Sequence, residues 1–242
     1  MNTLLNGSLR GEEAASPDNA EIALDIIPEA VNSQKGVSVR YVKTPDNDWY
    51  VLRVSYGREV KARDMLIDMG IYAHVAQRYE MKEIGGKRRK VLVSLLPNLL
   101  FAYLPKTSAD FYVKGPSILS GRDDQYQTNA LALSSLVSFY YNHFEKAVYD
   151  AGKNPPLTIA DREMISFIRA TSTMSEHLKS VDMEKCRILN DKMVEVIRGD
   201  YKGVKGRMAR VAGQQCIVVS LANGKWNIST EYIPTPYIRV LE

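Results

Sequence analysis

The segment from Trp49 to Leu104 constrains the fold most, because its apolar residues change from a strand period to a helix period. Aromatic and β-branched residues fill positions 49–54 and predict a strand. Apolar residues then recur at i, i+3, i+4 and i+7 between 62 and 69, with Gly70 directly after them. This spacing predicts an amphipathic helix that ends at the glycine.

The second half of the segment predicts antiparallel strands. Residues 71–84 alternate between apolar and polar, and Gly85-Gly86 is typical of a hairpin turn. The apolar run 91–104 predicts a strand buried on both faces. The order β-α-β-β predicts an α+β domain in which helices flank an antiparallel sheet.

The rest of the chain divides into segments of different composition. Residues 1–47 are rich in small and acidic residues and predict a disordered tail, whereas 48–172 predict one globular domain. Within that domain we expect a loop over 120–131 and a last helix from about 161. Residues 173–190 are polar and aperiodic, as in a linker. Five short β-rich segments within 191–242 predict a small β-barrel.

Charge and cysteine content indicate the partners and the cellular compartment of the protein. Residues 1–40 hold three Lys/Arg and six Asp/Glu, whereas 192–242 hold eight Lys/Arg and four Asp/Glu. A basic C-terminal part favours a partner that contains nucleic acid, and simple solubility is the alternative. The two cysteines form no C-x-x-C motif. With no signal peptide and no membrane-spanning segment expected, we predict a reduced cytoplasmic protein.

The stretch "VEVIRGDYKGVKGRMARV" holds three glycines spaced by four and then three residues. A phosphate-binding P-loop needs Gly-Lys before Ser/Thr, and a dinucleotide site needs G-x-G-x-x-G. Neither is present: Gly203 precedes Val204, and Gly206 precedes Arg207. The glycines therefore predict a turn between two strands, with positive φ and close backbone approach.

This stretch resembles the KOW motif. The upstream "WYVLRVSYGREVKARDMLIDMGIYAHV", the basic hairpin and "LLPNLLFAYL" resemble the NGN domain of the NusG family of transcription elongation factors. The segment "NPPLTIADREMISFI" is similar to the closing part of that domain. The resemblance implies an NGN domain over 48–172, a linker over 173–190 and an SH3-like KOW barrel over 191–242. The region "SFYYNHF" to "NPPLTI" is most similar to the specialised antiterminators of capsular-polysaccharide operons, the UpxY type.

The resemblance implies a protein that binds the clamp coiled coil of RNA polymerase through an apolar pocket and suppresses pausing or termination. The residues that would form the pocket and its rim are Tyr50, Arg53, Leu96, Leu99, Phe101 and Tyr103. The alternative for each apolar residue is a place in the core. The family usually has Phe-Pro-Gly-Tyr where this chain has Leu96-Pro97-Asn98-Leu99. This departure favours a paralogue recruited to few operons.

Two further sets of residues are candidate contacts. Four basic residues at the hairpin tip are expected to contact the phosphates of DNA or nascent RNA. They are Lys87, Arg88, Arg89 and Lys90. The alternative is a solvated tip. The resemblance also implies that a loop of the KOW domain contacts Rho or a ribosomal protein. The residues of this loop are Gly199, Tyr201, Lys202, Gly203, Lys205 and Gly206. Tyr201 is expected to project from that loop, and the glycines to shape it.

No residue pattern indicates catalysis, and we expect neither an enzyme nor a bound cofactor or metal. The three histidines are scattered, and no nucleophile motif occurs. We expect a monomer that acts as an adaptor. The competing hypothesis is a KOW-containing RNA- or ribosome-binding protein that does not act on RNA polymerase.

Overall fold

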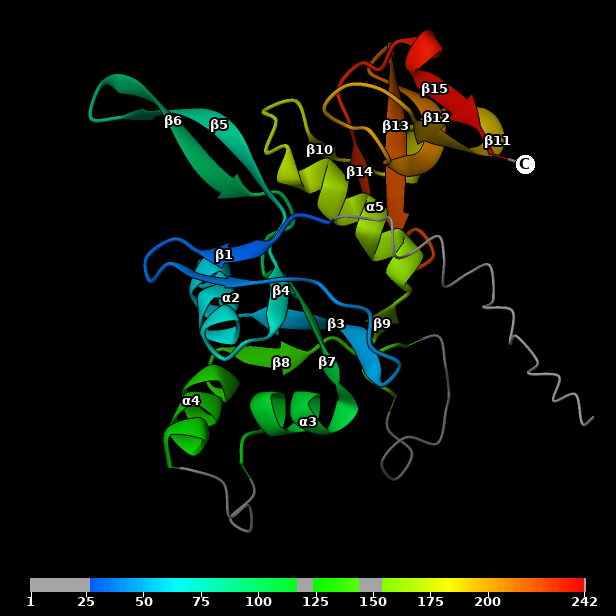
Figure 1. The fold of residues 1–242 in the computed structure, drawn as a ribbon. Coiled ribbons are helices and arrows are strands. Elements are labelled where there is room, and N and C mark those ends of the chain that lie inside the picture. The colour runs from blue at the N-terminus through cyan, green and yellow to red at the C-terminus, as the bar shows by residue number, and fades with distance from the viewer. Residues whose placement is uncertain (1–26, 117–123, 144–153, 242) are drawn as a thin grey trace, which may run out of the picture.

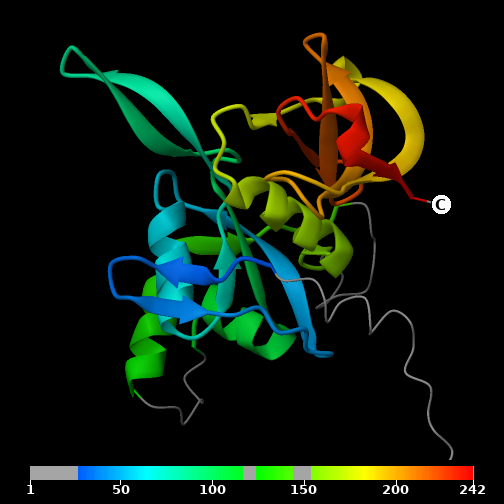
Figure 2. The same ribbon diagram turned by 45° about the horizontal axis from the view of Figure 1, so that its top comes forward.

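The computed structural model describes residues 27–116, 124–143 and 154–241. Two lobes lie on either side of helix α5 (Asp161–Ser172), as Figures 1 and 2 show. We call the described residues before α5 the N-terminal lobe and those from 179 to 241 the C-terminal lobe. The fold is mixed, with several antiparallel sheets and few helices.

The N-terminal lobe is built on a five-stranded antiparallel sheet of order β4-β7-β3-β8, with β9 also pairing with β3. Its strands are β3 (Asn47–Val54), β4 (Tyr72–His74), β7 (Leu99–Pro105), β8 (Val137–Phe139) and β9 (Thr158–Ile159). Successive side chains point to opposite faces of a strand. On β3, Trp49 and Val51 therefore pack in one hydrophobic cluster, while Tyr50 and Leu52 pack in another on the opposite face.

Three helices cover the face that carries Tyr50 (Figure 1). They are α2 (Glu59–Asp68), α3 (Lys106–Lys114) and α4 (Asp124–Ser134). Helix α2 confirms the predicted amphipathic helix, and Ala62 and Leu66 are buried from it. Helix α4 corrects the part of the loop expected over 120–131 that the structure describes, and Ala130 and Leu133 are buried from it. In the described part of the chain, no helix combines the length and apolarity needed to cross a membrane.

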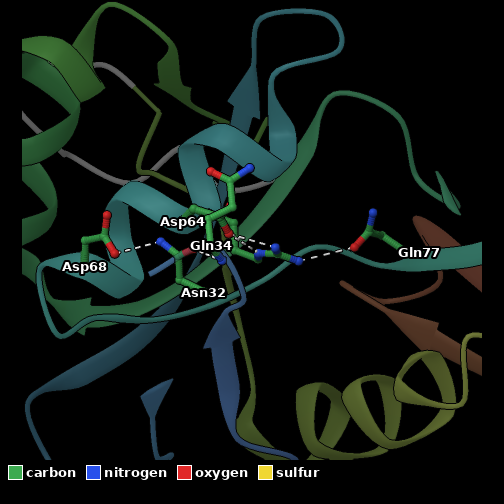
Figure 3. Close-up of polar contacts among 6 residues, drawn as sticks. Asn32, Gln34, Asp64, Asp68 and Gln77 are labelled. Carbon is green, nitrogen blue, oxygen red and sulfur yellow. Dashed lines mark hydrogen bonds and ion pairs between the residues drawn. The ribbon is translucent and has the colours of Figure 1, made fainter. Parts of the chain in front are cut away.

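Residues 27–47 are ordered, which corrects the tail expected over 1–47; the first 26 residues lie outside the described part. Strands β1 (Ala30–Asn32) and β2 (Val37–Val39) form a hairpin against α2. The Asn32 side chain is buried and donates from Nδ2 to Asp68 Oδ1 at 2.7 Å (Figure 3). Tyr41 then stacks on Trp49, with ring centroids 5.7 Å apart. These tertiary contacts stabilise a segment whose composition alone predicts disorder.

Strands β5 (Gln77–Ile84) and β6 (Lys87–Ser94) form a two-stranded antiparallel arm that projects from both lobes (Figures 1 and 2). Gly85 and Gly86 make the predicted turn, with φ of 59° and 74°. The run 91–104 is not one strand as predicted. A turn at Pro97-Asn98 separates β6 from β7, and Asn98 has a φ of 63° that no strand residue adopts.

The C-terminal lobe is a six-stranded antiparallel sheet of order β10-β14-β13-β12-β11-β15. Its strands are β10 (Lys179–Ser180), β11 (Arg187–Val196), β12 (Lys205–Val211), β13 (Gln214–Leu221), β14 (Trp226–Ser229) and β15 (Ile238–Val240). Single turns of 3-10 helix precede β11 and β15, at Met183–Lys185 and Thr235–Tyr237. No ladder joins the edge strands β10 and β15 among the described residues, so closure into the predicted barrel is not observed.

The expected linker, residues 173–190, contributes to this sheet. Lys179 and Ser180 of β10 pair with β14, and β11 begins at Arg187. The unpaired connection after α5 is therefore shorter than the sequence predicts. Polar residues such as Lys179 and Ser180 suit a short edge strand with exposed side chains, which periodicity cannot distinguish from a linker.

Helix α5 is shared by the two lobes. Its Phe167 is fully buried, with its ring 5.3 Å from that of Phe101 in the five-stranded sheet. On the C-terminal side, Ser166 Oγ accepts a hydrogen bond from the Lys205 backbone N–H at 3.2 Å. One hydrophobic cluster runs from Trp49 through α5 to the six-stranded sheet. The lobes thus share a core instead of being joined only through a flexible connection.

His74 joins β4 to this helix and makes stability depend on pH. Thr171 Oγ1 donates to the Phe167 carbonyl, and the His74 Nε2–H donates to Thr171 Oγ1 at 2.7 Å. Burial, with a smaller effect of the Arg63 charge, lowers the pKa of His74 from 6.5 to about 3. Below pH 6.5 the unfolded chain therefore binds a proton that the folded chain does not bind.

We expect the free energy of unfolding to fall by about 1.3 kcal/mol per pH unit between about pH 5.5 and 4, through His74 alone. Urea denaturation at a series of pH values would measure this slope. His74→Gln should remove it, and the matched variant His177→Gln, at an exposed position, should retain it. An unchanged slope in His74→Gln would contradict the assignment.

Candidate functional site

The residues expected to form a polymerase-binding pocket do not share one surface. Tyr50, Leu96, Leu99, Phe101 and Tyr103 are buried, and Arg53 is exposed. Tyr50 packs in the cluster under the three helices, whereas Leu99, Phe101 and Tyr103 belong to the cluster on the opposite face, where Phe101 contacts α5. The single pocket expected from the sequence is therefore wrong, because neighbouring strand residues alternate between the faces.

Two of these residues do line an open recess between the lobes. Arg53 and Leu99 are cross-strand partners on β3 and β7, at the end of the sheet next to β14. The recess has a volume of about 490 Å³. Its lining consists of Arg53, Val54, Tyr56, Pro97, Asn98, Leu99, Tyr140 and Trp226. We call this the junction recess.

Aromatic rings and cations form one wall of the junction recess. The Arg53 guanidinium carbon and Lys225 Nζ each lie 4.5 Å from the centroid of the Tyr140 ring. The Tyr140 and Trp226 rings meet edge to face, with centroids 5.1 Å apart. Partial burial favours a higher pKa for Tyr140, but Lys225 and Arg53 outweigh it and lower that pKa. Arginine, tyrosine and tryptophan are the residues that most often dominate protein interfaces.

Tyr56 is the most exposed member of the wall. It lies in the loop between β3 and α2, and 88% of its surface is accessible. A large aromatic side chain exposed to this extent gains little from folding. The position therefore suits a contact to a partner better than a role in the core.

The floor of the recess is fixed by the turn at Asn98. Its backbone N–H donates to Glu59 Oε1 at 2.7 Å, and its carbonyl accepts from the Val54 N–H at 2.9 Å. Asn98 has a left-handed φ of 63°, which asparagine tolerates better than most residues. This accounts for an asparagine at the position of the turn that needs a left-handed φ.

The loop expected to bind a second partner contacts α5 of the same chain. Tyr201 is buried, with its hydroxyl 3.5 Å from Thr173 Oγ1, so it does not project as predicted. Arg169 donates from Nη1 to the Gly203 carbonyl at 2.9 Å. Lys202 is exposed, whereas Lys205 is half-buried. The helix thus occupies most of the predicted contact surface of this loop.

The glycines of this loop have the shaping role expected of them. Gly199 and Gly203 have positive φ angles of 80° and 82°. A Cβ at Gly206 would lie 2.5 Å from the Val218 carbonyl oxygen, which is a backbone atom of the neighbouring strand. Tight packing against the sheet therefore requires glycine at 206.

The four basic residues expected at the hairpin tip are all exposed on β6, in the half of the arm that lies farthest from the lobes. They are Lys87, Arg88, Arg89 and Lys90. The arm therefore presents them away from both lobes, as the nucleic-acid interpretation requires.

A larger recess, of about 740 Å³, lies between Pro155–Thr158 and Ala222–Lys225. Its lining includes Lys106 and Asn142. Residues 144–153, next to Asn142 in the chain, are outside the described part, so the extent of this recess is not defined. Among the described residues, no three His, Cys, Asp or Glu side chains lie together as a metal site would need.

Comparison with known proteins gives distant similarity to solved structures. No protein-family model and no curated protein matches the chain. Among solved structures, the chain is similar to one described as "Domain interaction in Thermotoga maritima NusG". The two share 15% sequence identity with a TM-score of 0.32, and the alignment covers 81% of this chain and 98% of that chain. We therefore argue function below from the residues and their geometry.

Proposed function

We propose that the chain is a NusG-like transcription factor that binds RNA polymerase through the junction recess and suppresses pausing or termination. The observation that carries the proposal is the open recess lined by Arg53, Tyr56, Tyr140 and Trp226. It adjoins the strand pair β3–β7, to which the sequence resemblance assigns the polymerase-binding residues. The clamp coiled coil of the polymerase is the proposed occupant.

The chemistry of the recess suits an α-helical partner. Exposed aromatic side chains bury a large area on contact and lose little rotamer freedom. Leu99 and Pro97 add an apolar floor, and Arg53 can pair with a carboxylate on the helix surface. A partner bound in this way would contact both lobes at once, since Trp226 belongs to the C-terminal lobe.

The proposed effect on transcription is a shift between two polymerase conformations. A factor that binds the closed clamp better than the open, paused form stabilises the closed form by the difference in its affinities. A coupling of about 1–3 kcal/mol changes that equilibrium roughly 5- to 150-fold. No catalytic step is needed, so we propose a cytoplasmic adaptor that is a monomer without cofactors.

We further propose that the factor acts on few operons, such as those for capsular polysaccharide. The basis is the resemblance of "SFYYNHF" to "NPPLTI" to the UpxY type, together with an apolar floor that contains Leu99 in place of the usual tyrosine. Recruitment would then depend on nucleic acid contacts of the arm. A Rho or ribosomal contact through the 199–206 loop would have to use Lys202, because Tyr201 is buried.

The test is capture of the full chain by purified bacterial RNA polymerase core enzyme. The whole chain is needed, because α5 contributes to the core of both lobes. We expect a saturable complex and a shorter pause lifetime in single-round transcription. Absence of binding at micromolar concentrations, together with unchanged pausing, would refute the proposal. Binding to ribosomes but not to polymerase would favour the alternative, a KOW-containing RNA- or ribosome-binding protein.

A further inference from the structure

The register of the arm assigns its charged residues to two faces. Directly opposed residues of an antiparallel pair point to the same side, and successive residues alternate. Lys82 is opposite Arg89, and Ile84 is opposite Lys87, so these four share what we call the first face. The second face holds Tyr79, Met81 and Glu83, together with their partners Leu92, Lys90 and Arg88.

The cations of the second face have favourable neighbours within the arm. Arg88 is directly opposite the negative charge of Glu83, a favourable cross-strand placement, although the two side chains form no ion pair in the described structure. Lys90 Nζ lies 4.6 Å from the centroid of the Tyr79 ring. A cation over an aromatic face is stabilised by the ring quadrupole. Neither residue therefore needs an external anion.

The cations of the first face lack such partners. Lys82 and Arg89 are like charges placed directly opposite each other, which destabilises a strand pair. Lys87 adds a third positive charge two residues from Arg89 on the same face. The carboxylate on this face, Glu80, lies 3.7 Å from Arg78, nearer the lobes. Within the described part of the chain, no carboxylate forms an ion pair with Lys82, Lys87 or Arg89.

We propose that Lys82, Lys87 and Arg89 form the nucleic-acid-binding face of the arm and hold the phosphodiester backbone of duplex DNA. Three exposed cations along a ribbon, none of them in an ion pair within the described part of the chain, favour a polyanion with regularly spaced charges. A two-stranded β-ribbon is also narrow enough to enter the major groove. The arm projects from both lobes, so a duplex can approach it without contacting them (Figure 1).

This inference deepens the proposed function, since a factor held on polymerase would present the arm to the template duplex. The inference divides the four basic residues expected from the sequence into two that contact DNA and two that do not. Lys87 and Arg89 contact DNA together with Lys82, which the sequence pattern did not single out. Arg88 and Lys90 do not contact the backbone.

The test uses the full chain and a fluorescein-labelled DNA duplex of about 24 base pairs without polymerase, so that binding to DNA is measured separately from binding to polymerase. Fluorescence anisotropy at 50 to 200 mM salt gives both the affinity and its salt dependence. Each phosphate contact contributes about 0.9 to the slope of log K against log salt. The variant Lys82→Gln/Arg89→Gln should reduce that slope by about 2 and the affinity at 50 mM salt roughly tenfold.

The matched control is Arg88→Gln/Lys90→Gln. It also removes two positive charges, and all the substituted residues of both variants lie within the four residue pairs nearest the turn of the arm. It should leave the slope and the affinity near the wild-type values. Equal losses in both double variants would show that net charge alone matters and would overturn the assignment of a face. No binding of the wild-type chain to duplex would overturn it too, as would tighter binding to single-stranded DNA or RNA of the same sequence.

Both double variants should still bind RNA polymerase, because neither alters the junction recess. If the wild-type chain does not bind polymerase, the proposed function is refuted, but the DNA measurement remains valid. A wild-type chain that binds polymerase but not the DNA duplex would refute only the inference about the arm.

Discussion

Phe167→Ala is expected to lower the free energy of unfolding of the whole chain by about 3–5 kcal/mol. Phe167 is fully buried at the centre of α5, with its ring 5.3 Å from Phe101 and 6.0 Å from His74. Truncation leaves a cavity in the helix that both sheets pack on. Because the hydrophobic cluster is continuous through α5, the C-terminal lobe should lose stability together with the N-terminal lobe.

The two tryptophans of the chain allow each lobe to be followed separately. Trp49 is buried in the N-terminal lobe, and Trp226 lies on β14 in the C-terminal lobe. With fluorotryptophan at both positions, fluorine NMR should show the two resonances lost at one denaturant concentration. That midpoint should fall equally for both in Phe167→Ala. Val240→Ala, at a half-exposed position on β15, should change stability by no more than about 0.5 kcal/mol.

Separate midpoints in the wild-type chain would show that the lobes fold independently. The same conclusion would follow if Phe167→Ala changed only the Trp49 transition. The free energy of coupling between the two lobes through α5 would then be small compared with the free energy of unfolding of each lobe.

Periodicity predicted the elements whose own residues alternate or recur regularly. Helix α2 followed from the spacing of Ala62 and Leu66, and the arm from the alternation that ends at Gly85-Gly86. The glycines of 199–206 were interpreted correctly as shaping residues, because positive φ and close approach are properties of glycine itself. In these cases the information is local.

Elements that depend on distant contacts could not be predicted in this way. The hairpin of residues 30–39 contains a buried Asn32, whose partner Asp68 lies 36 positions away. Nothing near Asn32 in the sequence indicates that partner. In α4, Leu131 is exposed next to the buried Ala130, so apolar residues occur on both its inner and outer sides and give no clear helical period.

The junction recess could not be predicted for the same reason, because its residues come together only through distant contacts. Arg53 was identified through the family resemblance, but Tyr140 and Trp226 come from two later parts of the chain. The aromatic run around Tyr140 was a visible signal, but it was used only for the resemblance and not as a contact site. Only the packing of the C-terminal lobe brings Trp226 within 5.1 Å of Tyr140.

The geometry also changes which substitutions can test binding. Phe101 is fully buried, so a charged residue there would unfold the chain and would not report on the recess. Leu99 lines the recess but is buried as well. The informative position is an exposed one whose side chain contributes little to folding.

Tyr56→Ala is therefore expected to weaken binding to RNA polymerase core enzyme roughly 30-fold, which corresponds to about 2 kcal/mol. The side chain lines the recess and is 88% exposed, so the free energy of unfolding should be unchanged within about 0.5 kcal/mol. Interferometry with immobilised polymerase would give the dissociation constants, and denaturation would verify the stability.

The matched control is Tyr232→Ala, which removes the same side chain from a 57% exposed position outside the recess. It should bind polymerase as the wild-type chain does. Equal affinities of the two variants would place the polymerase contact elsewhere, since the most exposed aromatic of the recess would then contribute nothing. A selective loss in Tyr56→Ala, with Tyr232→Ala unchanged, would identify the recess between the lobes as the docking site.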